Sequence, residues 1–444
     1  MNVIFALVGG LLFSLALYTY VLHSLMKKKK LELLEWFLLA IGTFNGIVFG
    51  FVIWATSIGR NPFSLSGWFI QFDTYNVSMF FLLNFVLSLS VFFGWHFSVS
   101  TTRKRRMEKK YKPQYIYKKL ILTAWVSFLL AFIAYALYTR PYGGFIGILD
   151  YSRAIRSGVV GISNPFSFLK PFGSLAFFSS FIFFGALIDK KQKFVQKKII
   201  LLGFILSFLF SIYVLYQRQG RLSIVSFLVI FILALVLYNY KSILTFIRKI
   251  IGILISSILL IIVADFLLEQ SGKELGIIEL FAKELSFPFV SYIFQFNYGE
   301  YNWFKDILIA PVFILPQRIW SGVFNIETTS SLNTLQILGA RKGEAGVTGE
   351  IPIDMVTFGL MQGSILGIVV VGILFGYILH KISVRINLIP IKSIRSIIFA
   401  TVVIKVVILS VFYGDPEQII SRNFDLITGL LLSILFIKFT LRKR

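Results

Sequence analysis

The sequence predicts an all-α polytopic membrane protein, and three observations lead to this fold class. Of the 444 residues, 57% are hydrophobic and only 14% are charged, whereas soluble domains carry about 25% charged residues. Apolar runs of about 20 residues, long enough to cross a bilayer as helices, recur along the whole chain. The short alternating segments typical of a transmembrane barrel are missing. We therefore expect a single integral membrane domain over residues 1–444.

About 11 transmembrane helices are predicted, one for each apolar run. The first run has no basic residues before it, and its lysines follow it, so we expect a retained helix and not a cleaved signal peptide. Each later run is separated from the next by a connection that is either strongly basic or contains few lysines. In chain order, the predicted helices are 2–25, 33–55, 76–98, 120–138, 171–188, 199–216, 222–239, 250–268, 354–379, 397–413 and 423–438.

Basic residues gather in alternate connections and predict the orientation of the chain. These connections and the C-terminal tail hold 29 of the 44 Lys and Arg residues. The positive-inside rule places them in the cytoplasm, so the N-terminus is expected outside and the C-terminus inside. The basic segments are 27–30, 101–119, 189–198, 241–249, 380–396 and 438–444.

One long external loop, 269–353, is the largest feature between the predicted helices. It opens with EQSGKELGIIELFAKELS, whose apolar residues recur at helical spacing, and we expect this stretch to lie in the outer interface. The apolar pieces FPFVSYIFQF and DILIAPVFILP follow. Each is too short to span the bilayer, so we expect interfacial or re-entrant segments. A loop of this length in a compact protein usually has a function.

The cations on the two predicted sides differ in kind. The cytoplasmic segments hold 21 Lys and 8 Arg, whereas the outer segments hold 5 Lys and 9 Arg. Arginine presents a planar fork that binds phosphate or carboxylate through two hydrogen bonds. Arg218 and Arg221 stand in the tight hairpin VLYQRQGRLSIV, and the tip of this hairpin contains no acidic residue. We predict that these two bind an anionic ligand, with phosphate the leading candidate. For the other outer arginines, an ion pair with an outer acidic residue is an equally open explanation.

Several kinds of chemistry are disfavoured by missing residues. There is no cysteine, and the three histidines, His23, His96 and His380, lie near predicted cytoplasmic helix ends. We therefore expect no metal and no other cofactor. The net charge of +24 could suggest nucleic acid, but its distribution follows membrane topology, so no nucleic-acid partner is expected. The remaining outer residues suit a metal-independent reaction, in which arginines stabilise a phosphate leaving group and a carboxylate takes a proton.

The segment VTGEIPIDMVTFGLMQGSILGIVVVGILFGYI, residues 347–378, resembles a signature of Wzy-type oligosaccharide repeat-unit polymerases, the O-antigen polymerase family. That signature has an acidic residue, a Phe-Gly pair and then spaced small residues along the next helix. The arginine pair before Leu222 resembles the arginine-containing hairpin of the family. Chain length, the many spans and the long outer loop also match. The predicted external N-terminus departs from the family, because many members are drawn with both ends inside.

The resemblance implies a glycosyltransferase of polysaccharide biosynthesis in the bacterial cytoplasmic membrane. A sugar hydroxyl of one lipid-linked repeat unit would attack the anomeric carbon of an undecaprenyl-diphosphate-linked glycan, and undecaprenyl diphosphate would leave. The reaction would occur on the outer face and build O-antigen, capsule or a similar cell-envelope polymer. The implied partners are these lipid-linked oligosaccharides, membrane lipids, a chain-length regulator and a flippase.

Glu350 is the predicted catalytic base. It lies in the TGEIP turn just before the helix that begins near Asp354, and it has no evident local structural duty. Asp354 itself has a simpler explanation as the cap of that helix. Alternative acid or base residues are Glu344, Asp354, Asp415 and Glu417.

The diphosphate is predicted to bind outer arginines, which are given at the end of this paragraph. One lysine inside a span needs a separate explanation. Lys405 lies near the middle of an apolar run, where a lone charge costs about 2.5–3.5 kcal/mol. We expect it either to pair with an acid such as Asp425 or to line a wet cavity. The predicted diphosphate-binding residues are Arg218, Arg221, Arg341 and Arg422.

A lipid-linked oligosaccharide flippase or related transporter is the alternative. Such a protein would also need cations for a diphosphate, but usually within a central cavity between duplicated halves with broken helices. The sequence shows no duplication. An O-antigen ligase shares the architecture, but it is expected to use an external histidine, which this sequence lacks.

Overall fold

The computed structural model describes residues 3–58, 73–102, 113–159, 162–189, 194–239, 277–315 and 317–441, with a few isolated positions between 245 and 256. Every regular element in these ranges is a helix. The N-terminal half comprises α1 (Val3–Lys28), α2 (Leu33–Ile41), α3 (Phe49–Ser57), α4 (Thr74–Thr102), α5 (Pro113–Thr139), α6 (Gly144–Gly147), α7 (Ser152–Ser157), α8 (Leu175–Leu187), α9 (Phe194–Arg218) and α10 (Arg221–Tyr238). The C-terminal half comprises α12 (Ile277–Tyr298), α13 (Lys305–Ile309), α14 (Gln317–Trp320), α15 (Thr329–Leu338), α16 (Met355–Asn387), α17 (Lys392–Val402), α18 (Leu409–Phe412), α19 (Pro416–Arg422) and α20 (Phe424–Leu441).

Eight helical segments of the described residues are long and apolar enough to cross a membrane. Each corresponds to a predicted span, so the membrane-helical fold class is confirmed. Of the other three, 222–239 corresponds to the shorter apolar helix α10. The range 423–438 corresponds to α20, which meets α19 at a bend of 59°. Most of 250–268 lies outside the described residues. The eight segments are Val3–Lys28, Leu33–Ser57, Thr74–Ser100, Tyr115–Tyr142, Ser167–Leu187, Lys197–Arg218, Met355–Asn387 and Lys392–Phe412.

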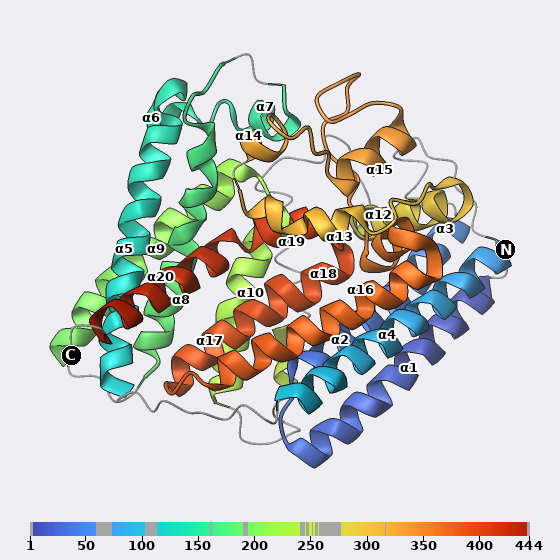
Figure 1. Ribbon diagram of the computed structural model, residues 1–444, viewed down its shortest axis with the longest axis horizontal. Coiled ribbons are helices and arrows are strands. Elements are labelled where there is room, and N and C mark those ends of the chain that lie inside the picture. Colours follow the sequence, from blue (N-terminus) through green and yellow to red (C-terminus); the bar gives the residue numbers. More distant parts are fainter. Residues whose placement is uncertain are drawn as a thin grey trace.

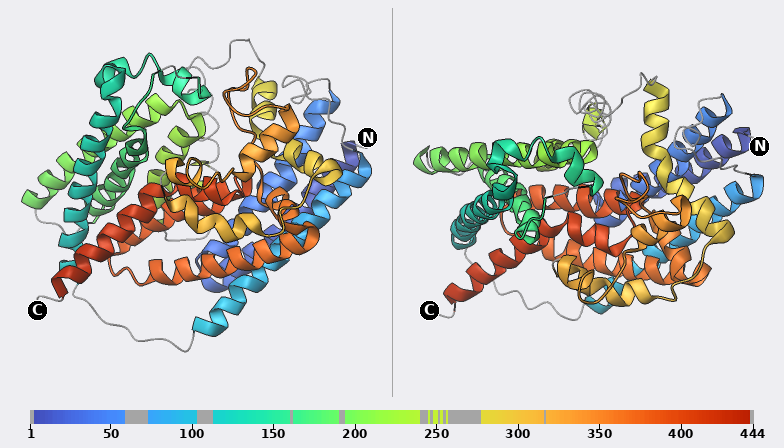
Figure 2. Two further views of the ribbon diagram at one scale, coloured as in Figure 1. Left: turned by 45° about the horizontal axis from the view of Figure 1, so that its top comes forward. Right: turned by 90° about the horizontal axis from the view of Figure 1, so that it is seen from above.

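The long helices form two groups (Figures 1 and 2). Helices α1, α2, α4 and α16 pack together on the side of the N-terminus, whereas α5, α8, α9 and α20 pack on the side of the C-terminus. Helix α17 lies between the groups and packs against α8 and α10. The short helices α6, α7, α14 and α15 lie at one end of the long helices, and the connections 29–32 and 388–391 lie at the other (Figure 1).

Close approach of α4 and α16 depends on glycine. A Cβ atom on Gly372 would lie 2.6 Å from Ser90 Cβ, and one on Gly94 would lie 2.7 Å from the carbonyl carbon of Ile373. Small residues let helix backbones approach in membranes, where dispersion between packed atoms drives association. The spaced small residues of segment 347–378 therefore have a packing role here.

Helix α16 is not continuous, unlike the predicted single helix 354–379. Gly363 (φ 150°, ψ 46°) and Ser364 (φ 58°, ψ −141°) leave the helical conformation. The close approach of residues on either side shows that the chain folds back here. A Cβ atom on Gly359 would lie 2.7 Å from Ile368 Cα. Residues nine apart in a straight helix are separated by about 13 Å along the axis. The 23 residues 365–387 still measure about 35 Å, enough to cross the bilayer.

The long loop 269–353 contains helix that packs into the core. Phe289 and Tyr292 of α12 are buried, and their rings contact Phe49 of α3 and Phe80 of α4 with centroids 4.8 Å apart in each case. The piece FPFVSYIFQF is therefore packed against membrane helices and does not lie at the molecular surface. Residues 269–276 of the predicted interfacial stretch lie outside the described part of the chain.

Candidate functional site

Three basic side chains line one cavity of about 110 Å³. Arg218 comes from the end of α9, Lys405 from the π-helical segment η6 (Val403–Ile408), and Arg422 from the last turn of α19. The rest of the lining is divided between hydroxyl groups and an apolar wall. The hydroxyls belong to Ser174, Ser223, Ser226 and Ser421, and the aromatic part of the wall consists of Phe177, Phe181 and Phe227.

Arg218 is held in place without a carboxylate partner among the described residues. Its Nη2 donates a hydrogen bond to the carbonyl of Lys170, 2.9 Å away, while its Nε is buried with no partner. The preceding residue, Gln217, accepts a 2.7 Å hydrogen bond from the hydroxyl of Tyr135. The hairpin tip is fixed as well, because Arg156 of α7 donates a 2.7 Å hydrogen bond to the carbonyl of Gln219. The hairpin therefore presents a positioned guanidinium group to the cavity.

Lys405 forms an ion pair with Asp425, as the sequence predicts. Both side chains are buried, with exposed fractions of 12% and 1%. The Lys405 Nζ lies 5.9 Å from the centroid of the Phe177 ring. The structure thus combines the two sequence-based alternatives, since Lys405 is both paired and part of a cavity lining.

Arg422 completes the group of cations at the bend between α19 and α20. Its guanidinium carbon lies 3.7 Å from the centroid of the Tyr413 ring, a cation–π contact. Its Nε donates to Gln418 Oε1 at 3.1 Å. Neither contact neutralises the charge, which leaves Arg422 available to an anion in the cavity.

The two other arginines predicted to bind diphosphate are Arg341 and Arg221. Arg341 pairs with Glu327 at 2.5 Å, and both side chains are well exposed. Its backbone N–H donates to Glu344 at 3.0 Å, which gives Glu344 a role in the local turn. Arg341 does not line the cavity, so the alternative of pairing with an outer acid describes its state. The side chain of Arg221 lies outside the described part of the chain.

Two of the candidate carboxylates have structural partners. Asp354 caps α16, accepting a 2.9 Å hydrogen bond from the Thr357 N–H, and its second oxygen has no partner. Asp415 accepts from the N–H and hydroxyl of Ser330 at 2.9 and 3.0 Å, and from the N–H of Glu417. Burial raises the pKa of each carboxyl, Asp354 and Asp415, to about 6. These contacts give Asp354 a role as a helix cap, and they give Asp415 a role in joining α19 to α15.

Glu350, in contrast, is exposed, and the described residues offer it no hydrogen bond or ion pair. The segment after it is fixed. The Ile351 N–H donates to Thr334 Oγ1 at 2.8 Å, and Ser291 Oγ donates to the Pro352 carbonyl, also at 2.8 Å. Glu417 is repelled by Glu350 and attracted by Arg422, so both charged groups lie within electrostatic range of Glu417.

Sequence reasoning missed two lysines near this cavity. The ammonium group of Lys170 experiences repulsion from both Arg218 and Lys342. Lys342 belongs to the loop after α15, which packs against Gly158 at the end of α7. Lys170 and Lys342 are isolated lysines in outer segments where arginine predominates. Only the fold brings these loops together, so no local signal identifies the pair.

No protein-family profile, curated protein or solved structure matches this chain. The chemistry of the site is therefore inferred from its own residues. In the described ranges, no group of three or more His, Cys, Asp or Glu side chains could hold a metal ion. Converging cations, hydroxyl donors and an adjoining aromatic wall suit an anion that carries a hydrocarbon group.

Proposed function

We propose that this protein is an oligosaccharide repeat-unit polymerase, a metal-independent glycosyltransferase of the bacterial cytoplasmic membrane. The observation that carries the proposal is the convergence of Arg218, Lys405 and Arg422 on one cavity with a phenylalanine wall. Partly buried cations that outnumber their acidic partners favour binding of an anion. In this proposal the chain has about 11 spans, with its N-terminus outside and its C-terminus inside.

The ligand is the diphosphate of an undecaprenyl-diphosphate-linked oligosaccharide. A cavity of about 110 Å³ accommodates a phosphate headgroup but not a polyprenyl chain, so the chain extends into the surrounding lipid. Cations positioned at a leaving diphosphate stabilise the charge that develops as the glycosidic bond breaks. Arg218 and Arg422 supply hydrogen bonds as well as charge, because each carries several guanidinium N–H donors.

Glu350 is the base that we assign to the acceptor hydroxyl. Its exposure leaves it accessible to a sugar, and the hydrogen bonds of Ile351 and Pro352 fix the chain immediately after it. A base must reach the proton that it removes. The supporting observation is that Glu350 and the cavity residue Arg422 both lie within electrostatic range of Glu417.

A lipid-linked oligosaccharide flippase is the second candidate, favoured by the break in α16. Transporters commonly bind substrate where helices are broken near the bilayer midplane. Here the break at Gly363 and Ser364 precedes a stretch of 23 residues, 365–387, that is itself long enough to span. The break therefore belongs at the end of a span, which favours the polymerase.

Loss of the gene distinguishes the two candidates. A polymerase mutant should display single repeat units on the cell surface in place of long polymer, whereas a flippase mutant should display none. Electrophoresis of the surface glycan, with the intact gene restored on a plasmid as a control, measures this directly. Long polymer of normal size in the deletion strain would contradict the proposal. If the deletion strain shows single repeat units, co-purification would test the expected partners, a chain-length regulator and a flippase.

A further inference from the structure

We propose that Lys405 is a third anion-binding residue and that Asp425 is a built-in counter-ion which the bound anion displaces from it. The inference deepens the proposed function, on which its choice of a polyprenyl diphosphate rests. It assigns roles to two residues that the sequence places within or beside membrane spans, where a structural ion pair is the simpler explanation.

The positions of Lys405 and Arg218 make the first argument. The Lys405 Nζ and the Arg218 guanidinium carbon each lie 5.9 Å from the centroid of Phe177. Two cations that share one aromatic ring repel each other, and Arg422 lines the same cavity. Such an arrangement costs free energy in an apolar setting unless an anion compensates it. Asp425 pairs with Lys405, and Glu417 interacts electrostatically with Arg422, so two acidic side chains stand against these three positive charges.

The state of Asp425 makes the second argument. The carboxylate uses Oδ1 for Lys405, but Oδ2 is buried with no hydrogen-bond partner. A buried ion pair that serves stability alone needs further hydrogen bonds to satisfy its remaining oxygen atoms. Asp425 lacks them, so a role in stability alone leaves one buried oxygen atom of the pair unsatisfied. A phosphate group with several oxygens can compete for the same ammonium group.

The backbone around Lys405 makes the third argument. Lys405 lies in the π-helical segment η6, and such segments inside α-helices are frequent at functional sites. Its carbonyl accepts a 3.3 Å hydrogen bond from Asn423 Nδ2, beside the 59° bend between α19 and α20. The backbone is thus held while the long side chain can turn from Asp425 toward the cavity.

The test uses the whole protein in detergent, with farnesyl diphosphate as the probe. Asp425→Asn removes the competing charge and leaves Lys405 unpaired in the empty protein. We expect at least about tenfold tighter binding by calorimetry, together with a lower Tm that the probe restores. The double variant Lys405→Met, Asp425→Asn should lose this gain and bind more weakly than the single variant. Unchanged or weaker binding by Asp425→Asn would overturn the inference.

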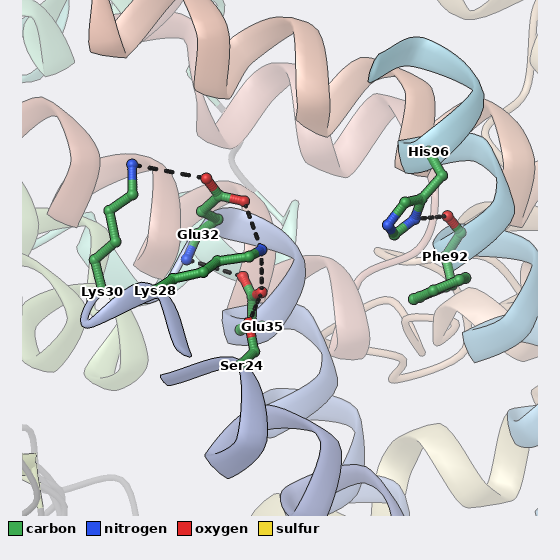
Figure 3. A network of polar contacts seen from close by, with 7 residues as sticks. All are labelled: Ser24, Lys28, Lys30, Glu32, Glu35, Phe92 and His96. Carbon is green, nitrogen blue, oxygen red and sulfur yellow. Dashed lines mark hydrogen bonds and ion pairs between the residues drawn. The ribbon is translucent and has the colours of Figure 1, made fainter. Parts of the chain in front are cut away.

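A matched control is the ion pair of Lys28 and Glu35 at the opposite end of the helices (Figure 3). Glu35 is fully buried, as Asp425 is, and accepts a 3.0 Å hydrogen bond from the Lys28 ammonium group. Glu35→Gln should lower Tm without changing probe affinity, and a similar gain in affinity would overturn the specific role of Asp425.

The outcomes separate the two proposals. Absence of binding by both wild type and Asp425→Asn would overturn the anion site itself. Tighter binding by Asp425→Asn, combined with normal polymer in the deletion strain, would support the counter-ion role and reject the polymerase function.

Discussion

Arg218 and Lys405 share one aromatic ring, that of Phe177, and each charged group lies 5.9 Å from its centroid. The two residues are 187 positions apart in the chain, and only the packing of α8 against α9 and α17 brings them to the same ring. Each cation–π contact contributes about 0.5–2 kcal/mol, depending on desolvation. This stabilisation offsets part of their mutual repulsion and keeps both cations at the cavity in the absence of ligand.

Replacement of Arg218 by lysine tests whether geometry matters beyond charge. Lysine has fewer hydrogen-bond donors than arginine and lacks its planar fork. The substitution should therefore weaken farnesyl diphosphate binding about tenfold to a hundredfold. Polymer length in cells should fall accordingly. Arg341→Lys is the control, because Arg341 pairs with Glu327 away from the cavity, and it should bind as wild type does. Equal affinity of Arg218→Lys and wild type would reject a role for the guanidinium fork.

The topology can be mapped with a reporter that is active only in the cytoplasm. Fusions after Lys110, Lys193 or Lys392 should be active, since these positions lie within basic connections. Fusions after Gln219 or Gly343 should be silent. Protein amounts measured by immunoblotting control for expression. An active fusion at Gly343 would put Glu350 on the wrong side of the membrane for the proposed reaction.

Asp354 should make stability depend on pH. Its pKa of about 6 in the folded protein exceeds the usual 3.8, so the folded state holds its proton more tightly than the unfolded state does. Stability therefore falls as pH rises between about 4 and 6, where the unfolded state has already lost that proton. Asp354→Asn keeps the cap to the Thr357 N–H and removes the buried charge. Its Tm should exceed that of wild type near neutral pH and vary less across this window.

A matched measurement checks the origin of that effect. Glu344 accepts its hydrogen bond in an exposed turn, so Glu344→Gln should leave the pH profile of Tm unchanged. A profile for Asp354→Asn that is identical to wild type would show that burial of Asp354 has no influence on folding stability.

Hydropathy predicts the eight long apolar helices of the described residues because apolar length is a local property of the chain. The pairing of Lys405 was also predictable, since a lone charge within a span requires compensation. The break in α16 was not predicted, because the short interruption by Gln362, Gly363 and Ser364 is compatible with a continuous helix as well as with a kinked one. Burial of Asp354 and the approach of Arg422 to Arg218 depend on contacts between distant segments. Hydropathy and residue spacing carry no information about such contacts.

Glu350 is the residue whose replacement most directly tests the chemistry. Glu350→Gln keeps the size of the side chain and removes the basic oxygen. Because Glu350 is exposed and makes no hydrogen bond within the described residues, the variant should accumulate normally and show an unchanged Tm. Loss of a general base typically slows a reaction about 100-fold or more. We therefore expect unchanged farnesyl diphosphate binding and little or no polymer.

Controls for this variant come from the other candidate carboxylates. Asp415→Asn disturbs three hydrogen bonds, so it should lower protein abundance and polymer together. Glu417→Gln removes the carboxylate that interacts with both Glu350 and Arg422, and its polymer should be shortened less than that of Glu350→Gln. Normal polymer from Glu350→Gln, with loss of polymer from a stable Glu417→Gln protein, would move the base from the loop to α19. If both variants polymerise normally, neither carboxylate is required. The cations that stabilise the leaving diphosphate would then account for most of the rate enhancement.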